Sequence, residues 1–253
     1  MSHFQRNNVD LYFEVAGSGT PILLTHGFAA TSRMWQAQQT AFAARNQIIS
    51  WDMRGHGRSA SPIDDASYSV EETVEDMAAL LDQLGHERAI IGGHSLGGYM
   101  ALAFYARFPD RVKALLIVST GPGYKSDTPR NDWNDMARGL GRRLEKHGLE
   151  ELKKLDREMD PADHDSVEGL GKAARGMLVQ RDSRIIDSLP DIRVPTLVVV
   201  GEKDRGYLAA SNYMAEKIQT ADLVTIPNAG HAVNMHQTED FNATTTRFFE
   251  QID

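Results

Sequence analysis

The stretch that decides the fold is Ile90-Ile91-Gly92-Gly93-His94-Ser95-Leu96-Gly97-Gly98-Tyr99. Its pattern predicts a short buried strand, a tight turn and then a helix, with Ser95 at the tip of the turn. A side chain at Gly93 or Gly97 would collide with the neighbouring strand or helix, so both positions require glycine. The first N–H groups of the helix and the positive end of its dipole face any anion that forms at the serine. We therefore predict that Ser95 is a catalytic nucleophile.

The alternative interpretation is a chance turn rich in glycine and serine, because the pattern G-x-S-x-G alone is only moderately specific. The flanking sequence argues against chance. An apolar run, Ala89-Ile90-Ile91, precedes the motif, and apolar residues at helical spacing follow it: Leu96, Met100, Phe104 and Phe108. This is the strand, turn and helix context that a nucleophile requires.

The composition argues against several classes of protein. The 253 residues have a net charge of −8, which disfavours binding to nucleic acid or to an anionic membrane surface. The chain has no cysteine, which excludes disulfides, a thiolate nucleophile and thiolate metal sites. The first residues lack the apolar core of a signal peptide, and the longest apolar runs are strand-sized. We expect a cytoplasmic, soluble protein, monomeric or homodimeric, that acts on a small molecule.

Strand and helix patterns alternate along most of the chain. Residues 9–16 alternate in polarity, as in an antiparallel edge strand, whereas the later apolar runs are continuous, which is typical of buried parallel strands. A capping box of Ser69 and Glu72 begins one helix. The expected later strands are 21–25, 47–51, 89–91, 112–119, 195–201 and 223–226, and the expected helices are 33–44, 70–84, 96–108, 209–218 and 238–252. The alternation predicts an α/β fold with a parallel sheet covered on both faces.

The segment 122–190 has a different character. It is densely charged, shows no strand pattern and has Glu–Lys pairs at helical spacing, which indicates solvated helix faces. Recurring apolar residues predict several short amphipathic helices: Leu140, Leu144, Leu149, Leu152, Leu155 and Met159. We predict that residues 122–190 form a helical cap, or lid, over the carboxyl edge of the sheet, and that residues 1–121 and 191–253 form the core.

A serine hydroxyl is a poor nucleophile until a base takes its proton, so a histidine is expected at the same sheet edge. His231 follows the last expected strand and precedes the terminal helix, which places it at that edge. His236 is the nearest alternative, but it lies on the approach to the terminal helix, where a structural role is expected. We predict that His231 is the base.

The base requires an acid that fixes its tautomer and stabilises the imidazolium. Asp204 follows the strand 195–201 through a short turn, again at the carboxyl edge of the sheet. Glu202 is a weaker candidate because it lies at the strand end itself. The loop after the preceding strand supplies no acid before Asp127, which lies inside the cap. We predict that Asp204 is the acid.

The developing oxyanion requires two donors. One is expected to be the backbone N–H of Leu96, directly after the nucleophile. The other is expected to be the N–H of Phe28, because the turn at His26-Gly27 lets the chain double back toward the serine.

Several other polar residues invite a functional interpretation. His26, His56 and His94 could be metal ligands, but they adjoin glycine-rich turns and lack carboxylate partners at ligand spacing. We expect them to hydrogen-bond loop backbone and predict no metal site. Asp52 and Arg54 are interpreted as a pair that fixes a turn.

Together these motifs closely resemble the α/β-hydrolase fold family. The motifs occur in the order that this family has. They are His26-Gly27-Phe28, Asp52 to Ser59, Gly93 to Gly98, Gly201 to Asp204 and Gly230-His231. The resemblance implies a mostly parallel eight-stranded sheet, a helical cap after the sixth strand and a Ser–His–Asp triad that needs no cofactor. Family members with aspartate at the elbow, such as haloalkane dehalogenases and epoxide hydrolases, do not match Ser95. The single-glycine turn resembles the esterase, lactonase and C–C hydrolase branches.

The substrate pocket is expected between the cap and the sheet. We predict that it is lined by Phe28, Leu96, Gly121, Trp133, Met136, Met177 and Val233. An apolar pocket favours an uncharged carboxylic ester or lactone. Arg138, Arg142 or Arg175 could instead meet a substrate carboxylate.

Three functions follow from these features. The leading one is hydrolysis of esters or lactones through an acyl-enzyme intermediate. The alternatives are C–C bond hydrolysis of a ring-cleavage product, and a ligand receptor that retains the triad but turns over slowly.

Overall fold

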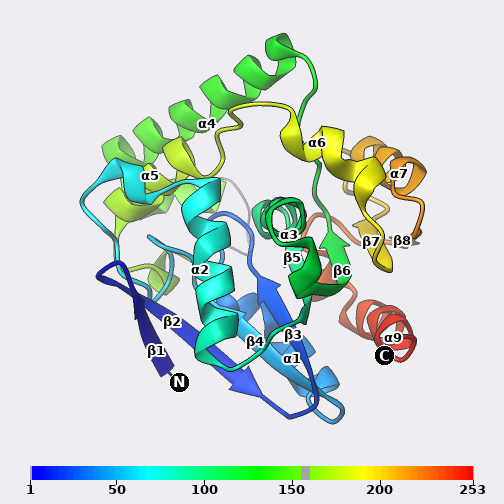
Figure 1. Cartoon of the computed structure of the whole chain (residues 1–253). Coiled ribbons are helices and arrows are strands. Elements are labelled where there is room, and N and C mark those ends of the chain that lie inside the picture. Colours follow the sequence, from blue (N-terminus) through cyan, green and yellow to red (C-terminus); the bar gives the residue numbers. More distant parts are fainter. Residues whose placement is uncertain (1, 155–159, 253) are drawn as a thin grey trace.

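The chain forms one mixed sheet whose strand order is β1-β2-β4-β3-β5-β6-β7-β8 in a computed structural model that describes residues 2–154 and 160–252 (Figure 1). Strands β1 and β2 pair antiparallel, β2 and β4 pair antiparallel, and the other neighbours are parallel. The strands are β1 (Ser2–Arg6), β2 (Val9–Ala16), β3 (Thr20–Thr25), β4 (Asn46–Trp51), β5 (Ala89–His94), β6 (Val112–Val118), β7 (Thr196–Gly201) and β8 (Ala221–Ile226). The predicted mostly parallel, eight-stranded α/β sheet is confirmed.

The edge of the sheet differs from the sequence prediction. Residues 9–16 were expected at the edge, but β2 lies between β1 and β4, and β1 is the outer strand. Asn7 and Asn8 join β1 to β2 with φ of 50° and 61°, the left-handed backbone of a tight hairpin turn. The Asn-Asn pair was therefore the available signal for the additional strand.

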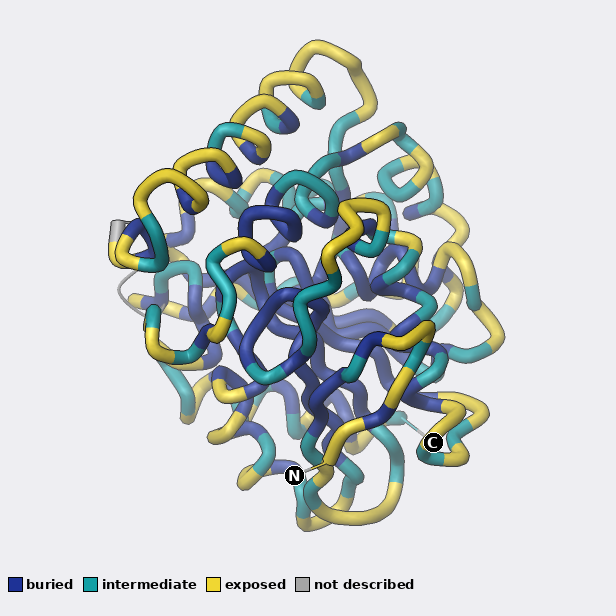
Figure 2. The backbone as a smooth tube through the Cα atoms, turned by 90° about the vertical axis from the view of Figure 1, so that its left-hand side faces the viewer, coloured by how far each residue is buried: buried dark blue, intermediate teal, exposed yellow. Residues whose placement is uncertain are grey.

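Helices cover both faces of the sheet. The elements are η1 (Ser32–Trp35), α1 (Gln36–Phe42), η2 (Asp65–Ser67), α2 (Val70–Gln83), α3 (Leu96–Arg107), η3 (Pro109–Arg111), α7 (Leu208–Lys217), α8 (Val233–His236) and α9 (Thr238–Phe249). None of the described helices is long and apolar enough to cross a membrane. Figure 2 shows that the central backbone is buried, while exposed positions lie on outer loops and on the outer faces of helices such as α4.

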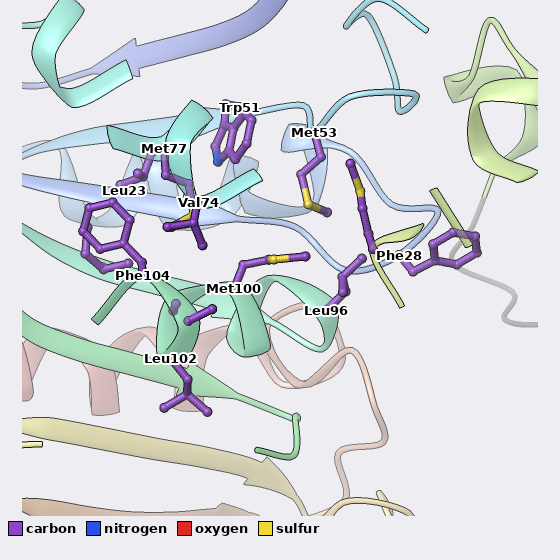
Figure 3. Close-up of a cluster of buried hydrophobic side chains, with 14 of the residues drawn as sticks. Leu23, Phe28, Trp51, Met53, Val74, Met77, Leu96, Met100, Leu102 and Phe104 are labelled. Atoms are coloured by element: carbon purple, nitrogen blue, oxygen red, sulfur yellow. The ribbon is translucent and has the colours of Figure 1, made fainter. Parts of the chain in front are cut away.

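Alternate residues of the parallel strands enter two hydrophobic cores. Leu23 and Ile91 join the core under α2 and α3, whereas Ile22 and Ile90 join the core under α1 and α9. Figure 3 shows the first core, in which side chains of β3, α2 and α3 converge. Because both faces are covered, these strands read as continuous apolar runs in the sequence.

The capping box before α2 is only half formed. The Ser69 hydroxyl accepts a hydrogen bond from the N–H of Glu72 at 3.0 Å, as predicted. The Glu72 carboxylate instead binds the guanidinium groups of Arg6 at 2.7 Å and Arg54 at 3.2 Å. A charged partner thus replaces the reciprocal backbone contact of the motif.

The segment between β6 and β7 is helical over its described residues. Its elements are α4 (Asp127–His147), η4 (Leu149–Lys154), η5 (Pro161–Asp163), α5 (Val167–Gly176), α6 (Arg184–Ser188) and η6 (Leu189–Asp191). The 21-residue helix α4 corrects the expectation that all of these helices would be short. Leu155 and Met159 of the predicted pattern lie outside the described residues. Figure 1 shows α4 and α5 at one end of the molecule, beyond the upper end of β3.

Helices α4 and α5 pack closely. Buried Leu140 and Leu144 of α4 share the first core with Leu170 of α5. The backbones approach at Gly141, where a Cβ atom would lie 2.7 Å from the carbonyl oxygen of Gly171. This close contact stabilises a helix whose outer face is charged.

Candidate active site

Ser95 lies at the sharp turn between β5 and α3, with φ 52° and ψ −115°. Its N–H donates to the carbonyl oxygen of Val118 at 2.9 Å, which fixes the turn against β6. Cβ atoms at Gly93 and Gly97 would lie 2.2 Å from backbone atoms of Gly97 and Thr25, respectively. Positive φ at a non-glycine residue costs about 1–3 kcal/mol, which the surrounding structure must offset. The turn places Ser95 directly after β5 and at the N-cap of α3.

His231 and Asp204 form a hydrogen-bonded pair at the same edge of the sheet. The Nδ1 atom of His231 lies 2.9 Å from Oδ2 of Asp204, and Asp204 is 7% exposed. Asp204 follows β7, and His231 follows β8. With Nδ1–H donated to the carboxylate, Nε2 is left as the basic nitrogen. Ser95 and His231 line the same cavity of about 120 Å³, which we call the small cavity.

The alternative residues have other partners. His236 accepts a hydrogen bond at Nδ1 from the N–H of Gly230 at 3.0 Å, and Glu202 accepts one from the N–H of Asn228 at 2.9 Å. Both contacts hold the loop that carries His231. Asp127 pairs with Arg130 in the first turn of α4. These three residues are thus engaged in local structure.

His94 contacts both the backbone and the ring of His231. Its Nε2 lies 2.9 Å from the carbonyl oxygen of His231, and the two ring centroids are 4.6 Å apart. Burial lowers the pKa of His94 to about 3, and the nearby His231 adds to the shift. The neutral ring therefore donates its Nε2–H and fixes the backbone of the residue beside it.

His26 and His56 also bind backbone, as predicted. His26 accepts at Nε2 from the N–H of Met53 at 2.9 Å, and its Nδ1 lies 2.7 Å from the carbonyl oxygen of Gly27. His56 contacts the carbonyl oxygen of Arg54 at 3.0 Å. The expected pairing of Asp52 with Arg54 is wrong, however.

Asp52 and Arg54 have different partners and do not contact each other through any hydrogen bond or ion pair among the described residues. Asp52 accepts hydrogen bonds from the N–H groups of Ser32 at 2.7 Å and Arg58 at 2.9 Å. Arg54 forms a buried ion pair with Asp76, which lies on α2, at 2.6 Å. Sequence reasoning chose the nearest carboxylate, whereas α2 brings a buried one from 22 residues away.

The loop after β3 approaches the serine closely. A Cβ atom at Gly27 would lie 3.3 Å from Cβ of Ser95 and 2.8 Å from Nδ1 of His94. Gly27 and Phe28 line the small cavity together with Ser95 and His231. Leu96 occupies the first position of α3, where a backbone N–H has no partner within its helix.

His164 links the segment between β6 and β7 to this loop. Its Nδ1 accepts from the N–H of Gly57 at 3.1 Å, so its Nε2–H donates to the carbonyl oxygen of Ala29 at 2.9 Å. Ala29 has φ 57° and follows Phe28 directly. His164 is 5% exposed, because the segment before α5 folds inward.

Tyr207 is a site residue that sequence reasoning missed. Its ring stacks on that of His231, with centroids 4.9 Å apart and planes 22° apart. Burial raises the pKa of Tyr207, and the interaction of its hydroxyl with Ser95 acts in the opposite direction. The available signal was its position three residues after Asp204, in the same loop.

Ser95 also lines a second cavity of about 240 Å³, which we call the large cavity. Four residues predicted to line the pocket, Leu96, Gly121, Trp133 and Met177, line it together with Tyr207. Two other predicted lining residues are placed elsewhere. Met136 is 42% exposed on α4, and Val233 is fully buried in the core under α1 and α9. Val233 is the first residue of α8, and its side chain packs into that core rather than into a cavity.

The arginines considered for a substrate carboxylate line neither cavity. Arg138 pairs with Asp135 at 3.2 Å, and Arg175 pairs with Glu145. Arg142 is exposed on α4. Over the described residues the lining of the large cavity is uncharged, whereas Arg33, Asp160 and Asp163 also line the small cavity.

Comparison with known proteins identifies the family. A model of the alpha/beta hydrolase family matches residues 22–244. The chain belongs to the alpha/beta hydrolase family, and its fold is the one that this family shares.

Several known proteins are similar to this chain. One is RutD of Azorhizobium caulinodans, whose name describes it as a proposed carbamate hydrolase. It is 40% identical over 119 residues, which are 47% of this chain and 44% of that protein. The matched segment thus spans less than half of that relative. A thermophilic esterase from Thermogutta terrifontis has a TM-score of 0.83 and 29% identity, with 96% and 94% of the two chains covered. Est816, described as degrading N-acyl homoserine lactones, has a TM-score of 0.77 and 29% identity over 98% of this chain and 100% of its own.

Proposed function

We propose that this protein hydrolyses carboxylic esters or lactones through an acyl-enzyme intermediate. Ser95 is the nucleophile, His231 the base and Asp204 the acid. The observation that supports this assignment most strongly is the 2.9 Å bond between His231 and Asp204, made while His231 shares a cavity with Ser95. The esterase and lactone-degrading proteins at 29% identity add support for the substrate class.

In the first step Nε2 of His231 takes the hydroxyl proton of Ser95 as its oxygen attacks the carbonyl carbon. Asp204 stabilises the imidazolium through Nδ1 and keeps the ring in one tautomer. The negative charge that develops on the carbonyl oxygen is stabilised by the N–H groups of Phe28 and Leu96. Loss of one such donor typically lowers kcat about a hundred- to thousandfold.

The imidazolium then gives its proton to the departing alcohol oxygen, and an ester forms between Ser95 and the acyl group. A water molecule loses a proton to His231 and attacks the carbonyl carbon of this ester. The bond between that carbon and the Ser95 oxygen then breaks, His231 returns the proton to Ser95, and the carboxylic acid is released. Each step thus moves one proton between Nε2 of His231 and the oxygen of Ser95, of the departing alcohol or of water.

The position of His231 suggests where the two halves of the substrate bind. The departing oxygen must lie near His231, which lines the small cavity with Met235 and Arg33 but not the large cavity. The alcohol part therefore lies in the small cavity, and the acyl part lies in the large cavity beside Leu96 and Trp133. Ligand cavities are commonly about 300–1,000 Å³, and both of these are smaller, so a short substrate is expected.

The cap is part of this proposal. Residues 122–190 supply Trp133 and Met177 to the wall of the large cavity, which Ser95 also lines. The proposed triad itself comes from residues 1–121 and 191–253. The cap thereby excludes water from the acyl group, which strengthens the electrostatic interactions of the site.

The test is a panel of short p-nitrophenyl esters and lactones with the wild type and Ser95→Ala. We expect multiple turnovers with the wild type and loss of activity in Ser95→Ala. Full activity of the variant would reject the proposal. Turnover of a dienoate ring-cleavage product without ester hydrolysis would assign the protein to C–C bond hydrolysis instead.

A further inference from the structure

A third hollow lies beyond the large cavity, between α2, α3 and α6. We call it the outer cleft, and its volume is about 310 Å³. Val74, Ala103 and Ile185 contribute an apolar lining, and charged residues such as Arg107 and Arg184 also line it. Ser95, His231 and Asp204 do not line the outer cleft, so the proposed reaction gives it no role.

A thin wall separates the outer cleft from the large cavity. Part of it is the end of α5 with the chain that follows, where Gly176, Val179 and Arg181 line the outer cleft and Met177 and Gln180 line the large cavity. Because residues of one short segment line both hollows, the wall is a single segment thick. The side chain of Tyr99 completes it, since Tyr99 lines both hollows.

Tyr99 lies close to the reacting serine. Its N–H donates to the carbonyl oxygen of Ser95 at 3.1 Å, which is the first turn of α3. Residues four apart lie on the same face of a helix, about 6 Å apart along its axis. An acyl chain on Ser95 that extends through the large cavity therefore reaches Tyr99 after a few carbon atoms.

The phenol group of Tyr99 is not held by a hydrogen bond to any described residue. Burial raises its pKa, with the carboxylates of Asp182 and Glu71 as further causes, so the hydroxyl is neutral. A Cβ atom at Gly123 would lie 3.5 Å from its ring, which indicates that the ring packs against the cap segment. Its contribution to the wall is thus mainly its volume.

We propose that Tyr99 limits the length of the acyl chain, and that the outer cleft accepts the distal part of longer chains once this ring is absent. The inference rests on the proposed function and deepens it. It assigns the wild type to short-chain acyl groups, and it assigns the chain-length limit to one side chain outside the triad.

The test compares p-nitrophenyl esters from butanoate to decanoate. We expect Tyr99→Ala to raise the ratio of kcat/KM for decanoate to that for butanoate at least about tenfold. Tyr99→Phe is the matched control, because it keeps the ring and should leave the ratio within about twofold. Tyr99→Leu replaces Tyr99→Ala if the alanine variant does not fold, and the same direction is expected.

A second variant locates the added chain. Ala106 lines the outer cleft on the exposed part of α3, so Ala106→Trp fills the cleft without touching the triad. Ala106→Trp alone should leave butanoate hydrolysis unchanged, and adding it to Tyr99→Ala should abolish the gain on decanoate. An unchanged length profile in Tyr99→Ala, or a gain that survives Ala106→Trp, would overturn the inference.

Failure of the proposed function gives a different result. In that case the wild type hydrolyses none of these esters. The dependence of binding on chain length is then measured as the shift in Tm that each linear alcohol from butanol to decanol causes. Tyr99→Ala should then gain binding of decanol over butanol relative to Tyr99→Phe. Equal binding by the two variants would overturn the inference about Tyr99.

Discussion

At the scale of single residues, the candidate site contains two neighbouring carboxylates, and only one of them contacts His231. Asp204 and Glu202 lie two positions apart in one turn, yet Asp204 reaches Nδ1 of His231 while Glu202 reaches the N–H of Asn228. The shorter side chain is 7% exposed, whereas Glu202 is exposed. Burial strengthens the interaction between a carboxylate and an imidazolium, because fewer water molecules screen it.

We predict that Asp204→Asn lowers kcat about a thousand- to ten-thousandfold with little change in KM, because an amide favours the wrong tautomer of His231. Glu202→Gln is the matched control and should keep kcat within about threefold of the wild type. Steady-state kinetics on a short ester measures both. A larger loss in Glu202→Gln than in Asp204→Asn would contradict the assignment of the acid.

Tyr207 permits a second prediction at this scale. Tyr207→Phe keeps the ring that stacks on His231, whereas Tyr207→Ala removes it. We expect kcat to stay within about threefold of the wild type in the first variant and to fall at least about tenfold in the second, because a misplaced imidazole transfers protons poorly. Equal losses of kcat in the two variants would show that the ring does not position His231.

At the scale of elements, His164 connects the segment before α5 to the two loops around the site. It accepts from the N–H of Gly57 and donates to the carbonyl oxygen of Ala29. The second contact lies next to Phe28, whose N–H is a proposed oxyanion donor. The described part of the segment between β6 and β7 is thereby linked to the loop that carries the proposed oxyanion donor.

We predict that His164→Ala lowers the free energy of unfolding by about 1–3 kcal/mol, because two buried backbone groups lose their partner. It should also lower kcat more than it raises KM, since the donor at Phe28 is needed in the transition state. Urea unfolding and steady-state kinetics measure these changes. His147→Ala, at the exposed end of α4, should cost less than about 1 kcal/mol. Equal losses in the two variants would contradict the prediction.

The sequence predicted the elements whose signals are local. The strands of the parallel sheet, α2, α3 and the turn at Ser95 were found because apolar periodicity and glycine spacing are written in consecutive residues. The edge strand β1 was missed because it is short and its Asn7-Asn8 turn was not recognised. The length of α4 was underestimated because a charged helix that packs along one stripe resembles several short helices.

The candidate site was predictable only in part, for a related reason. Ser95, Asp204 and His231 each follow a strand, and the topology brings the carboxyl ends of parallel strands together. Contacts between distant elements gave no local signal. The ion pair of Arg54 with Asp76, the contact of His164 with Ala29 and the inward turn of Val233 depend on tertiary packing.

At the scale of the whole molecule, buried histidines couple stability to pH. Burial lowers the pKa of His26 to about 4 and of His94 to about 3, and it also lowers the pKa values of His56 and His164. In the unfolded chain these groups have a pKa near 6.5. Below that pH the unfolded chain binds more protons than the folded one, so acid favours unfolding.

We predict that the free energy of unfolding is nearly constant above about pH 7 and falls as the pH drops from about 6.5 to 5. A fully buried imidazole contributes about 1–2 kcal/mol to this loss. Urea titrations across this range measure the slope, which should be smaller in His94→Asn and unchanged in the exposed-site control His147→Gln. Stability that rises as the pH falls through this window would contradict the prediction.

The central claim is that the strained turn at Ser95 presents an activated serine to His231 and Asp204. The most direct measurement is labelling with a fluorophosphonate, followed by mass spectrometry of the modified peptide. We predict one adduct per chain, on Ser95, with a rate that falls at least about a hundredfold in Asp204→Asn and His231→Ala. Labelling of a different residue, or of Ser95 at the same rate in all three proteins, would contradict the account.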